Sequence, residues 1–439
     1  MLNKDFVIEQ NPWWRDKALI DSDQQVGRAL AASPQKLYSF EDENLLILGP
    51  RQVGKTTFVK LCIRDLLLNK KVDPKNILFF SAESLSSKDD ILALASYFET
   101  VADERHTAYL FLDEISFVDD WNIAILALFN SGYLNGKRIY LTGSSSISLQ
   151  KETLPGRNIK KRFFYPLSFS EYIDLFYKSD LKTKQVEGID ILRKDKFYEK
   201  ARDLLPYVKE LDRHMDAYLK YTGGYLTASY AYNKTKKDPF DSYYEIYKDA
   251  IISDIAKAEK SQQMFKETMY GVVVSYGSAF SANSISKKTS IGSHKTVEEY
   301  LEIADKLFAL KTFYKFANGR VMYRSNKKSY FIDPFLYRVI KYYATGSKEL
   351  KPQEIPALAE GVVGALLSRK YDSIYYRVND AGRETDFFYN NLGIEVKYGP
   401  GKFSELNSDS GYLLTMDEEV LKEGNKVKMP VSIFLYLLG

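Results

Sequence analysis

The stretch Leu45–Leu68, LLILGPRQVGKTTFVKLCIRDLLL, constrains the fold of this chain more than any other feature. Its first four residues, Leu45–Leu48, are apolar and predict a buried strand, and its last part has a helical pattern. Between them, Gly49–Thr56 fits the pattern G-x-x-x-x-G-K-[ST]. A glycine loop that leads from a strand into a helix directs backbone N–H groups and the positive end of the helix dipole at an anion. We therefore expect a phosphate-binding loop, in preference to a glycine-rich turn that binds nothing.

Each residue of this loop has an expected task. Lys55 would reach the β- and γ-phosphates of a nucleotide, and the Thr56 hydroxyl would hold Mg²⁺. The backbone of the other residues would surround the phosphates. The predicted nucleotide-binding residues are Gly49, Pro50, Arg51, Gln52, Val53, Gly54, Lys55, Thr56 and Thr57.

A second apolar run, Tyr109–Glu114 (YLFLDE), ends in two carboxylates. On a strand beside the phosphate loop, Asp113 would lie near Mg²⁺, usually through water. Glu114 would then polarise the water that attacks the γ-phosphate. Many strands end in an acidic turn, but one that follows a phosphate loop at this distance indicates a hydrolytic site. ATP and Mg²⁺ are the predicted cofactors, with Thr56 and Asp113 as metal ligands.

Two further segments offer candidate side chains. In Leu141–Ser146 (LTGSSS), Ser144 first and Thr142 second could contact the γ-phosphate or the attacking water; a serine-rich loop cap is the alternative. Arg157 lies in a basic run and could stabilise transition-state charge in its own site or in a neighbouring subunit's. The second case would require a homo-oligomer. A solvated run of charges is the alternative for Arg157.

Short apolar runs alternate with helical patterns from Leu45 to about Leu167, which is typical of parallel strands covered on both faces. The expected strands are Leu45–Leu48, Ile77–Ser81, Tyr109–Glu114, Ile139–Thr142 and Phe163–Leu167. Upstream, the adjacent Trp13 and Trp14 could support the domain or stack on an adenine, and we favour support because large aromatics usually bury.

The composition excludes several classes of protein. With 439 residues, two or three domains are expected. The net charge is only +4, so a nucleic-acid site would have to be a local patch. One cysteine and three scattered histidines exclude a disulfide framework and a structural zinc site. No signal peptide and no apolar run near 18 residues is present, which predicts a cytoplasmic protein without a membrane partner.

Residues 264–345 are similar to a winged helix-turn-helix, because three helical segments precede a hairpin with Asn318-Gly319 at its turn. The third helix carries Glu298, Glu299 and Glu302, which would face DNA phosphates badly. The hairpin is more basic. Its basic residues are Arg320, Arg324, Lys327 and Lys328. Two interpretations stay open: non-specific contact with a DNA backbone, or a structural bridge between the flanking domains.

The stretch Arg383–Tyr398, RETDFFYNNLGIEVKY, is the second one that carries chemistry. A turn at Asn390–Gly393 would pair Asp386 with Lys397 in an antiparallel hairpin. Alternation places Asp386, Glu395 and Lys397 on one face. The two carboxylates could bind Mg²⁺, and the lysine could position water and stabilise charge developing on a phosphodiester. An amphipathic hairpin whose charges face water is the alternative.

The segments GPRQVGKTT, YLFLDEI, LTGSSS, LPGR and YPLSFSEY together resemble prokaryotic AAA-type ATPases of the AAA+ superfamily, in the class with an additional strand and a catalytic glutamate. In one large group of these, a winged helix and a C-terminal domain of unknown function follow the ATPase in the same order. The hairpin resembles PD-(D/E)xK nucleases, in which a helix glutamate often completes the metal site. This resemblance implies Glu360 as a third ligand beside Asp386 and Glu395. Leu226 departs from the proline that many relatives have after their Gly-Gly-aromatic turn.

The chain is thus predicted to be an α/β P-loop NTPase of the AAA type with a parallel sheet, a helical lid, a winged helix and a restriction-endonuclease-like α/β domain. The expected parts are an N-terminal segment (1–44), the ATPase core (45–167), a helical lid and connector (168–259), the winged helix (260–345) and the nuclease-like domain (355–439). The resemblance implies ATP hydrolysis coupled to DNA binding or Mg²⁺-dependent DNA cleavage. The alternative is a nucleotide-dependent switch or scaffold with an inactive nuclease-like domain that binds DNA or a partner protein.

Overall fold

The computed structural model describes residues 3–32, 40–144, 154, 156–177, 189–379 and 381–439. Within it the chain divides into two compact units, residues 1–165 and 166–439. Ser145 and Ser146 of the LTGSSS segment, Pro155 of the LPGR segment and positions 178–188 of the expected helical lid lie outside the described residues.

The first unit contains a parallel five-stranded sheet in the order β2-β3-β4-β1-β5. Its strands are β1 (Leu45–Leu48), β2 (Ile77–Ser81), β3 (Ala108–Asp113), β4 (Lys137–Gly143) and β5 (Lys160–Phe163). This confirms the parallel α/β sheet. The fifth strand lies earlier than expected, because β5 is a mostly exposed edge strand that begins with two lysines and has no apolar run to mark it.

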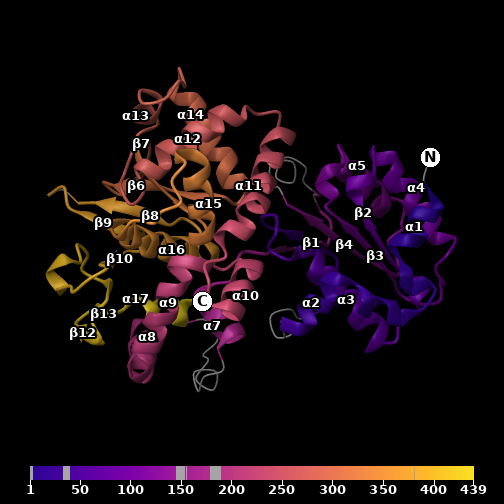
Figure 1. Ribbon diagram of the computed structural model, residues 1–439, viewed down its shortest axis with the longest axis horizontal. Helices are drawn as coiled ribbons and strands as arrows, with labels where there is room; N and C mark the ends of the chain where they lie inside the picture. The colour runs from indigo at the N-terminus through magenta and orange to yellow at the C-terminus, as the bar shows by residue number, and fades with distance from the viewer. Residues whose placement is uncertain (1–2, 33–39, 145–153, 155, 178–188, 380) are drawn as a thin grey trace. The chain divides into compact units, whose positions relative to one another are not determined.

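Helices cover both faces of this sheet. In Figure 1, α2 and α3 lie on one face, and α4 and α5 lie on the other. The helices of the unit are α1 (Lys4–Gln10), α2 (Gln24–Ala32), α3 (Lys55–Leu68), α4 (Lys88–Glu99) and α5 (Trp121–Asn130). β1 and β3 are buried along their whole length because both of their faces are covered.

The N-terminal segment is held against β2. The indole N–H groups of Trp13 and Trp14 both donate to the carbonyl of Ile77, at 3.1 and 2.8 Å. Asn11 exchanges side-chain hydrogen bonds with the N–H and carbonyl of Phe79, at 2.7 and 2.8 Å. The tryptophan pair therefore supports the domain, as expected, and the segment satisfies backbone groups at the open side of β2.

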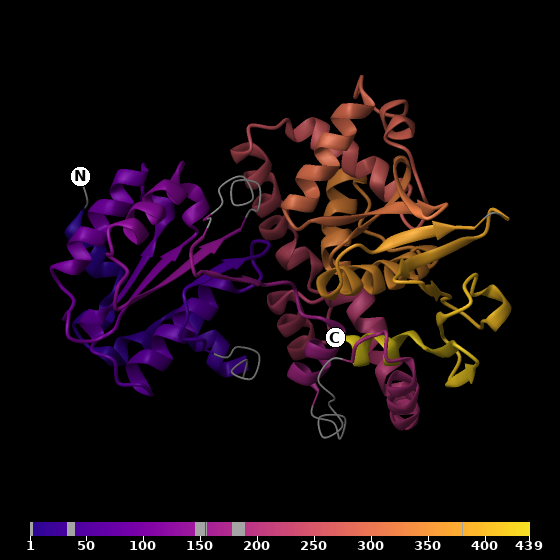
Figure 2. The same cartoon turned by 180° about the vertical axis from the view of Figure 1, so that it is seen from behind.

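The second unit contains a mixed eight-stranded sheet in the order β12-β13-β11-β10-β9-β8-β6-β7. The strands are β6 (Leu310–Ala317), β7 (Arg320–Phe331), β8 (Tyr375–Val378), β9 (Glu384–Tyr389), β10 (Leu392–Val396), β11 (Gly411–Thr415), β12 (Leu421–Glu423) and β13 (Lys426–Pro430). The helices are α7 (Phe169–Phe176), α8 (Lys194–Leu204), α9 (Val208–Ala217), α10 (Leu226–Thr235), α11 (Phe240–Lys257), α12 (Gln262–Val274), α13 (Ala282–Ser286), α14 (His294–Lys306), α15 (Pro334–Thr345), α16 (Ile355–Lys370) and α17 (Val431–Leu438). Figure 2 shows this unit from behind.

The hairpin β6–β7 belongs to the same sheet as the C-terminal strands. β6 pairs with β7 in antiparallel fashion and with β8 in parallel fashion. Three helices, α12 to α14, precede it at the expected positions. The winged-helix assignment and the five-part division stay predictions, but β7 can now contribute side chains to the candidate site on β9 and β10.

A buried carboxylate joins two segments of the second unit. Asp333 caps α15, accepting from the N–H groups of Phe335 and Leu336 at 2.8 and 3.3 Å. It also accepts from the Gly224 N–H at 2.6 Å. Burial raises the pKa of Asp333 to about 6, although these N–H donors and Arg369 oppose the rise.

We expect the stability of this unit to depend on pH through Asp333. The folded carboxyl has a higher pKa than an unfolded one, so the folded state binds the proton more tightly. The group's contribution is therefore largest below about pH 4 and falls by on the order of 3 kcal/mol as the pH rises through about 6. Urea unfolding of wild type and Asp333→Asn, followed by circular dichroism, should show their stability difference shrinking over this range. A difference that is independent of pH would contradict the assignment.

Candidate functional site

Two glycines shape the loop between β1 and α3. A Cβ on Gly49 would lie 2.0 Å from the carbonyl oxygen of Phe164, which follows the neighbouring strand β5. Gly54 has a left-handed φ of 101° directly before α3 begins. A side chain is thus excluded by close approach at the first position and disfavoured by backbone conformation at the second. The N-terminus of α3 lies at the end of this loop, as the sequence predicts.

Lys55 points back into the loop. Its Nζ donates to the carbonyl oxygens of Gly49 and Pro50, both at 3.0 Å, and lies 3.4 Å from Oε1 of Glu114. The residue is only 4% exposed. The structure therefore brings together the lysine and the glutamate that the sequence assigned to phosphate binding and to water activation.

Asp113 is held by two hydroxyl groups. Thr56 Oγ1 donates to its Oδ2 at 2.7 Å, and Thr142 Oγ1 donates to its Oδ1 at 2.6 Å. Burial raises the pKa of Asp113, as does the charge of Glu114, and the hydrogen bonds from the two threonines oppose this. The Thr56 hydroxyl and the Asp113 carboxylate are adjacent oxygen donors, which is the chemistry that Mg²⁺ requires. Thr56 and Asp113 therefore fit a bound Mg²⁺.

Glu114 has a strained backbone and a fixed side chain. Its φ and ψ are 52° and 44°, in the left-handed region. Its N–H donates to Thr142 Oγ1 at 2.8 Å, and its Oε2 accepts from the Ser144 N–H at 3.1 Å. Although burial opposes it, the charge of Lys55, the Ser144 hydrogen bond and Arg51 lower the pKa of Glu114. The carboxylate is therefore ionised and able to accept a hydrogen bond from water.

The remaining predicted residues of this site have mixed placements. Arg51 lies with its guanidinium 5.3 Å from the centre of the Phe117 ring. Arg157 donates a hydrogen bond to the side chain of Asn130, the last residue of α5. Ser144 is buried and reaches Glu114 through its backbone, so a γ-phosphate contact by its hydroxyl stays a prediction. Thr142 holds Asp113 and Glu114 in place.

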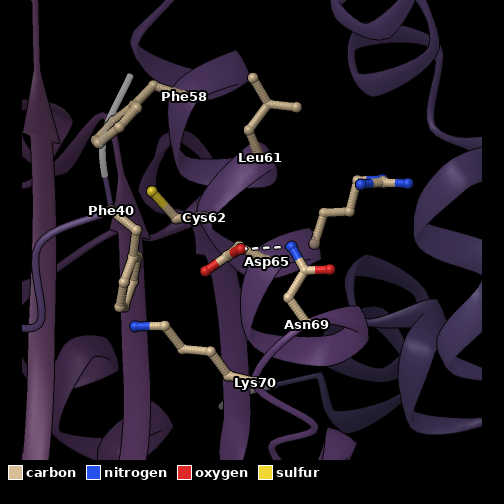
Figure 3. A pocket seen from close by; sticks show the side chains of 8 residues that line it. Phe40, Phe58, Leu61, Cys62, Asp65, Asn69 and Lys70 are labelled. Carbon is tan, nitrogen blue, oxygen red and sulfur yellow. Dashed lines mark hydrogen bonds between the residues drawn. The ribbon is translucent and has the colours of Figure 1, made fainter. Parts of the chain in front are cut away.

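A hollow of about 500 Å³ lies on another side of α3 and is lined by none of the predicted site residues (Figure 3). Its described lining residues are Phe40, Phe58, Leu61, Cys62, Arg64, Asp65, Asn69 and Lys70. The Lys70 Nζ lies 3.6 Å from the centre of the Phe40 ring, and Asn69 donates to Asp65 at 2.7 Å. Burial raises the pKa of Cys62, so this thiol stays protonated and packs as a small apolar side chain.

The candidate hairpin in the second unit has a different register from the predicted one. Leu392 pairs with Tyr389 and Ile394 with Phe387, across the two-residue turn Asn390-Asn391. Both turn residues have positive φ, as a tight hairpin turn requires. One further step along this register sets Glu395, not Lys397, opposite Asp386. The shift is by two residues, so the predicted sharing of one face is unchanged.

Close packing of α16 brings Glu360 to the same place. A Cβ on Gly364 would lie 2.6 Å from the Phe387 ring, and one on Gly361 would lie 3.1 Å from the Tyr330 ring. The helix can therefore approach the sheet closely beside Glu360. The Tyr330 hydroxyl donates a hydrogen bond to Glu360.

Lys328, on β7, is a site residue that the sequence reasoning treated as a surface charge of the hairpin. It is 1% exposed, and its Nζ lies 2.9 Å from Glu360, 2.6 Å from Glu384 and 3.1 Å from Asp386. Its neighbour Lys327 is also buried and pairs with Glu298 at 2.9 Å. Of the four basic residues named for the hairpin, Arg320 and Arg324 are exposed and the two lysines are buried. Side chains two residues apart on a strand share a face, so Lys328 lies on the same face of β7 as buried Tyr330. This alternation was the sequence signal that could have predicted the burial of Lys328.

Glu395 and Lys397 form the other half of the cluster. Lys397 Nζ lies 3.0 Å from Glu395 Oε1. Glu395 Oε2 is buried and has no hydrogen-bond partner among the described residues. Burial and the charge of Asp386 raise the pKa of Glu395 to about 7 and that of Glu360 to about 8, and the neighbouring lysines oppose both shifts. Glu395 Oε2 is therefore a buried carboxylate oxygen that a cation could bind.

The three carboxylates predicted as metal ligands lie in one cluster but are not arranged to hold one metal ion together. Across the part of the chain that the structure describes, no set of three or more His, Cys, Asp and Glu side chains is arranged to hold a metal ion. Lys328 and Tyr330 donate to Glu360, and Lys328 also donates to Asp386. The hairpin register sets Asp386 opposite Glu395, whose Oε2 has no partner among the described residues, so these two are the pair that could hold Mg²⁺. In the described ranges, none of the helices has the length and apolar character needed to cross a membrane.

Two family models match the chain. An AAA domain matches residues 41–173, and a domain of unknown function (DUF8612) matches residues 214–346. The first match covers β1, α3 and the acidic end of β3. Residues 41–173 are therefore an AAA-type, nucleotide-binding P-loop ATPase domain.

Relatives of the chain include two uncharacterized proteins. One, from Methanocaldococcus jannaschii, is 23% identical over 66% of this chain and 60% of its own length. The other, from Haemophilus influenzae, is 25% identical over 72% of each chain. The chain thus spans about three fifths of the archaeal relative.

Solved structures with similar parts include the Walker-type ATPase of Pyrococcus abyssi, at 14% identity and a TM-score of 0.39, covering 72% of this chain and 95% of that one. The ORC1 protein of Aeropyrum pernix, solved in complex with DNA, has 12% identity and a TM-score of 0.33, covering 72% and 91%. With TM-scores this low, neither likeness bears on the activity of this chain.

Proposed function

We propose, on the premise that residues 41–173 are an AAA-type P-loop ATPase domain, that the protein hydrolyses ATP at Lys55, Thr56, Asp113 and Glu114 and uses the turnover to control phosphodiester cleavage in DNA by its C-terminal cluster. The observation that carries the first half is the contact between Lys55 and Glu114 across the loop. The γ-phosphate would then lie on the Lys55 side of this ion pair, and the attacking water would lie on the Glu114 side.

ATP would compete for Lys55. Its phosphates offer the ammonium group stronger partners than the carbonyl oxygens of Gly49 and Pro50. Lys55 would turn to the β- and γ-phosphates and release Glu114 to accept a hydrogen bond from water. The water oxygen then bonds to the γ-phosphorus as the bond to the β,γ-bridging oxygen breaks, and the water proton passes to Glu114 or phosphate. Mg²⁺ held by Thr56 and Asp113 would neutralise phosphate charge.

The C-terminal half of the proposal depends on Asp386, Glu395 and Lys397. Asp386 accepts from the Val396 N–H at 2.9 Å, which fixes it beside β10. Lys397 is half-exposed and could donate to a scissile phosphate or position water. A cation bound by Asp386 and Glu395 would supply Lewis-acid stabilisation of the phosphate. We propose DNA as the partner of this cluster, and we further expect a homo-oligomer and a cytoplasmic location.

A second candidate function has its own support. Lys328 pairs with three carboxylates at once, as a purely structural salt cluster would. In that case the C-terminal domain would bind DNA or a partner protein without cutting, and the protein would be a nucleotide-dependent switch.

Plasmid nicking separates the two functions. With Mg²⁺ or Mn²⁺ and ATP, wild type is expected to nick supercoiled plasmid, and Asp386→Ala and Lys397→Ala are expected to reduce the rate at least about tenfold, since each removes a charge that the reaction needs. ATP turnover should persist in both. Gel assays with and without ATP measure the coupling.

Matched controls are Asp409→Ala and Lys402→Ala, exposed charges of the same domain, which should nick like wild type. Intact plasmid after incubation with folded wild type under both metals and ATP would replace the nuclease with the switch.

A further inference from the structure

The ammonium group of Lys328 lies among three carboxylates, in a position that a metal cation could otherwise occupy. It comes from β7, and its three partners come from α16 and β9. An ammonium has three N–H donors, and each of the three carboxylates lies within 3.1 Å of Nζ. Glu360 also accepts from the Tyr330 hydroxyl, so its Oε1 already has two donors.

The other end of the cluster contains a carboxylate oxygen without a partner. Glu395 is 6% exposed, and its Oε2 is buried with no hydrogen-bond partner among the described residues. Its Oε1 is paired with Lys397. A buried carboxylate oxygen without a partner is costly, so a bound group is the expected explanation.

The charge balance of the cluster also indicates a position for one further cation. Four carboxylates, Glu360, Glu384, Asp386 and Glu395, share two ammonium groups, Lys328 and Lys397. Fully ionised, the cluster has two uncompensated negative charges. One divalent cation neutralises them, whereas two would leave an excess of positive charge in a buried place.

We infer that Lys328 is a built-in cation that fills the position between Glu360 and Asp386, and that the cluster therefore binds one divalent cation, between Asp386 and Glu395. This inference rests on the proposed function, because it takes the cluster to be a metal-dependent site. It adds the number of metal ions that the cluster binds, and it identifies Lys328 as the residue that sets this number. Lys328 is a positioning residue, because it would hold Glu360 and Asp386 and touch neither the cation nor DNA.

Mn²⁺ titration followed by electron paramagnetic resonance tests the count. The full chain is used without nucleotide, with Asp113→Asn in every sample to remove binding at the ATPase site. This parent should bind one Mn²⁺, and Glu395→Gln should weaken that binding at least about tenfold. Glu360→Gln should leave both count and affinity unchanged within about threefold. Lys328→Met should bind two Mn²⁺, and its lowered thermal midpoint should rise on adding Mn²⁺, whereas Lys328→Arg should keep one.

Two Mn²⁺ in the parent, or a tenfold loss in Glu360→Gln, would overturn the inference, and so would a single Mn²⁺ in folded Lys328→Met. If Lys328→Met does not fold, the Glu360→Gln result decides alone. The outcome is separate from cleavage: one Mn²⁺ without plasmid nicking would reject the nuclease and keep the inference, and nicking with two Mn²⁺ would do the reverse.

Discussion

Glu114→Gln is expected to slow ATP hydrolysis by about 10²–10³-fold while leaving ATP binding within a few-fold of wild type. The amide keeps the size of the side chain and can still accept the Ser144 N–H, which lies 3.1 Å from Oε2 in the structure. It removes the negative charge that would polarise water. Loss of this charge also frees Lys55, which lies 3.4 Å away, so binding should not weaken. Steady-state phosphate release and a fluorescent-nucleotide titration measure the two quantities.

Glu104→Gln is the matched control, because Glu104 is an exposed acid of the same unit and should leave hydrolysis unchanged. Lys55→Ala provides the opposite pattern, since it should weaken nucleotide binding itself. Hydrolysis by Glu114→Gln within threefold of wild type would remove Glu114 from the mechanism.

The ATPase half could be predicted because its signals are local in sequence. Leu45–Leu48 form β1, and α3 starts within the loop motif. Asp113 and Glu114 fall at the end of β3, whose residues are all buried. In a parallel sheet, the carboxyl ends of strands meet at one edge, so the order strand, loop, helix, acidic strand fixes the site without knowledge of distant contacts.

The candidate site in the second unit depends on strand register and on tertiary contacts, which no local sequence pattern encodes. The hairpin register was wrong by two residues because the sequence NNLG allows a two- or a four-residue turn, and both keep the same face inward. Lys328 was taken for an exposed wing residue, although it lies in the half of β7 (Arg320–Phe331) beyond a register shift in its pairing with β6, and β7 belongs to the C-terminal sheet. Burial of a lysine becomes favourable only when carboxylates from α16 and β9 arrive, which is a tertiary event.

The turn at Thr222–Tyr225 shows the same limit, and it carries the second large prediction. Adjacent glycines such as Gly223-Gly224 indicate a helix stop, whereas in the structure Gly224 is a contact between backbones. Leu167 N–H donates to the Gly224 carbonyl at 2.8 Å, and the Gly224 N–H donates to Asp333 at 2.6 Å. A Cβ on Gly224 would lie 2.0 Å from the carbonyl oxygen of Leu167. Neither backbone can move without breaking a buried hydrogen bond.

Gly224→Ala is therefore expected to destabilise the second unit by about 3–4 kcal/mol, and to lower its thermal midpoint by roughly 10 °C. Gly292→Ala is the matched control: a Cβ there meets nothing within 4 Å, and its φ is not left-handed, so the change should stay within about 0.5 kcal/mol. Circular dichroism melts measure both, because all three tryptophans lie in the first unit and their fluorescence would miss the second. Equal melting of the two variants would show that Leu167 and Gly224 separate at little cost, and that Asp333 alone holds the turn.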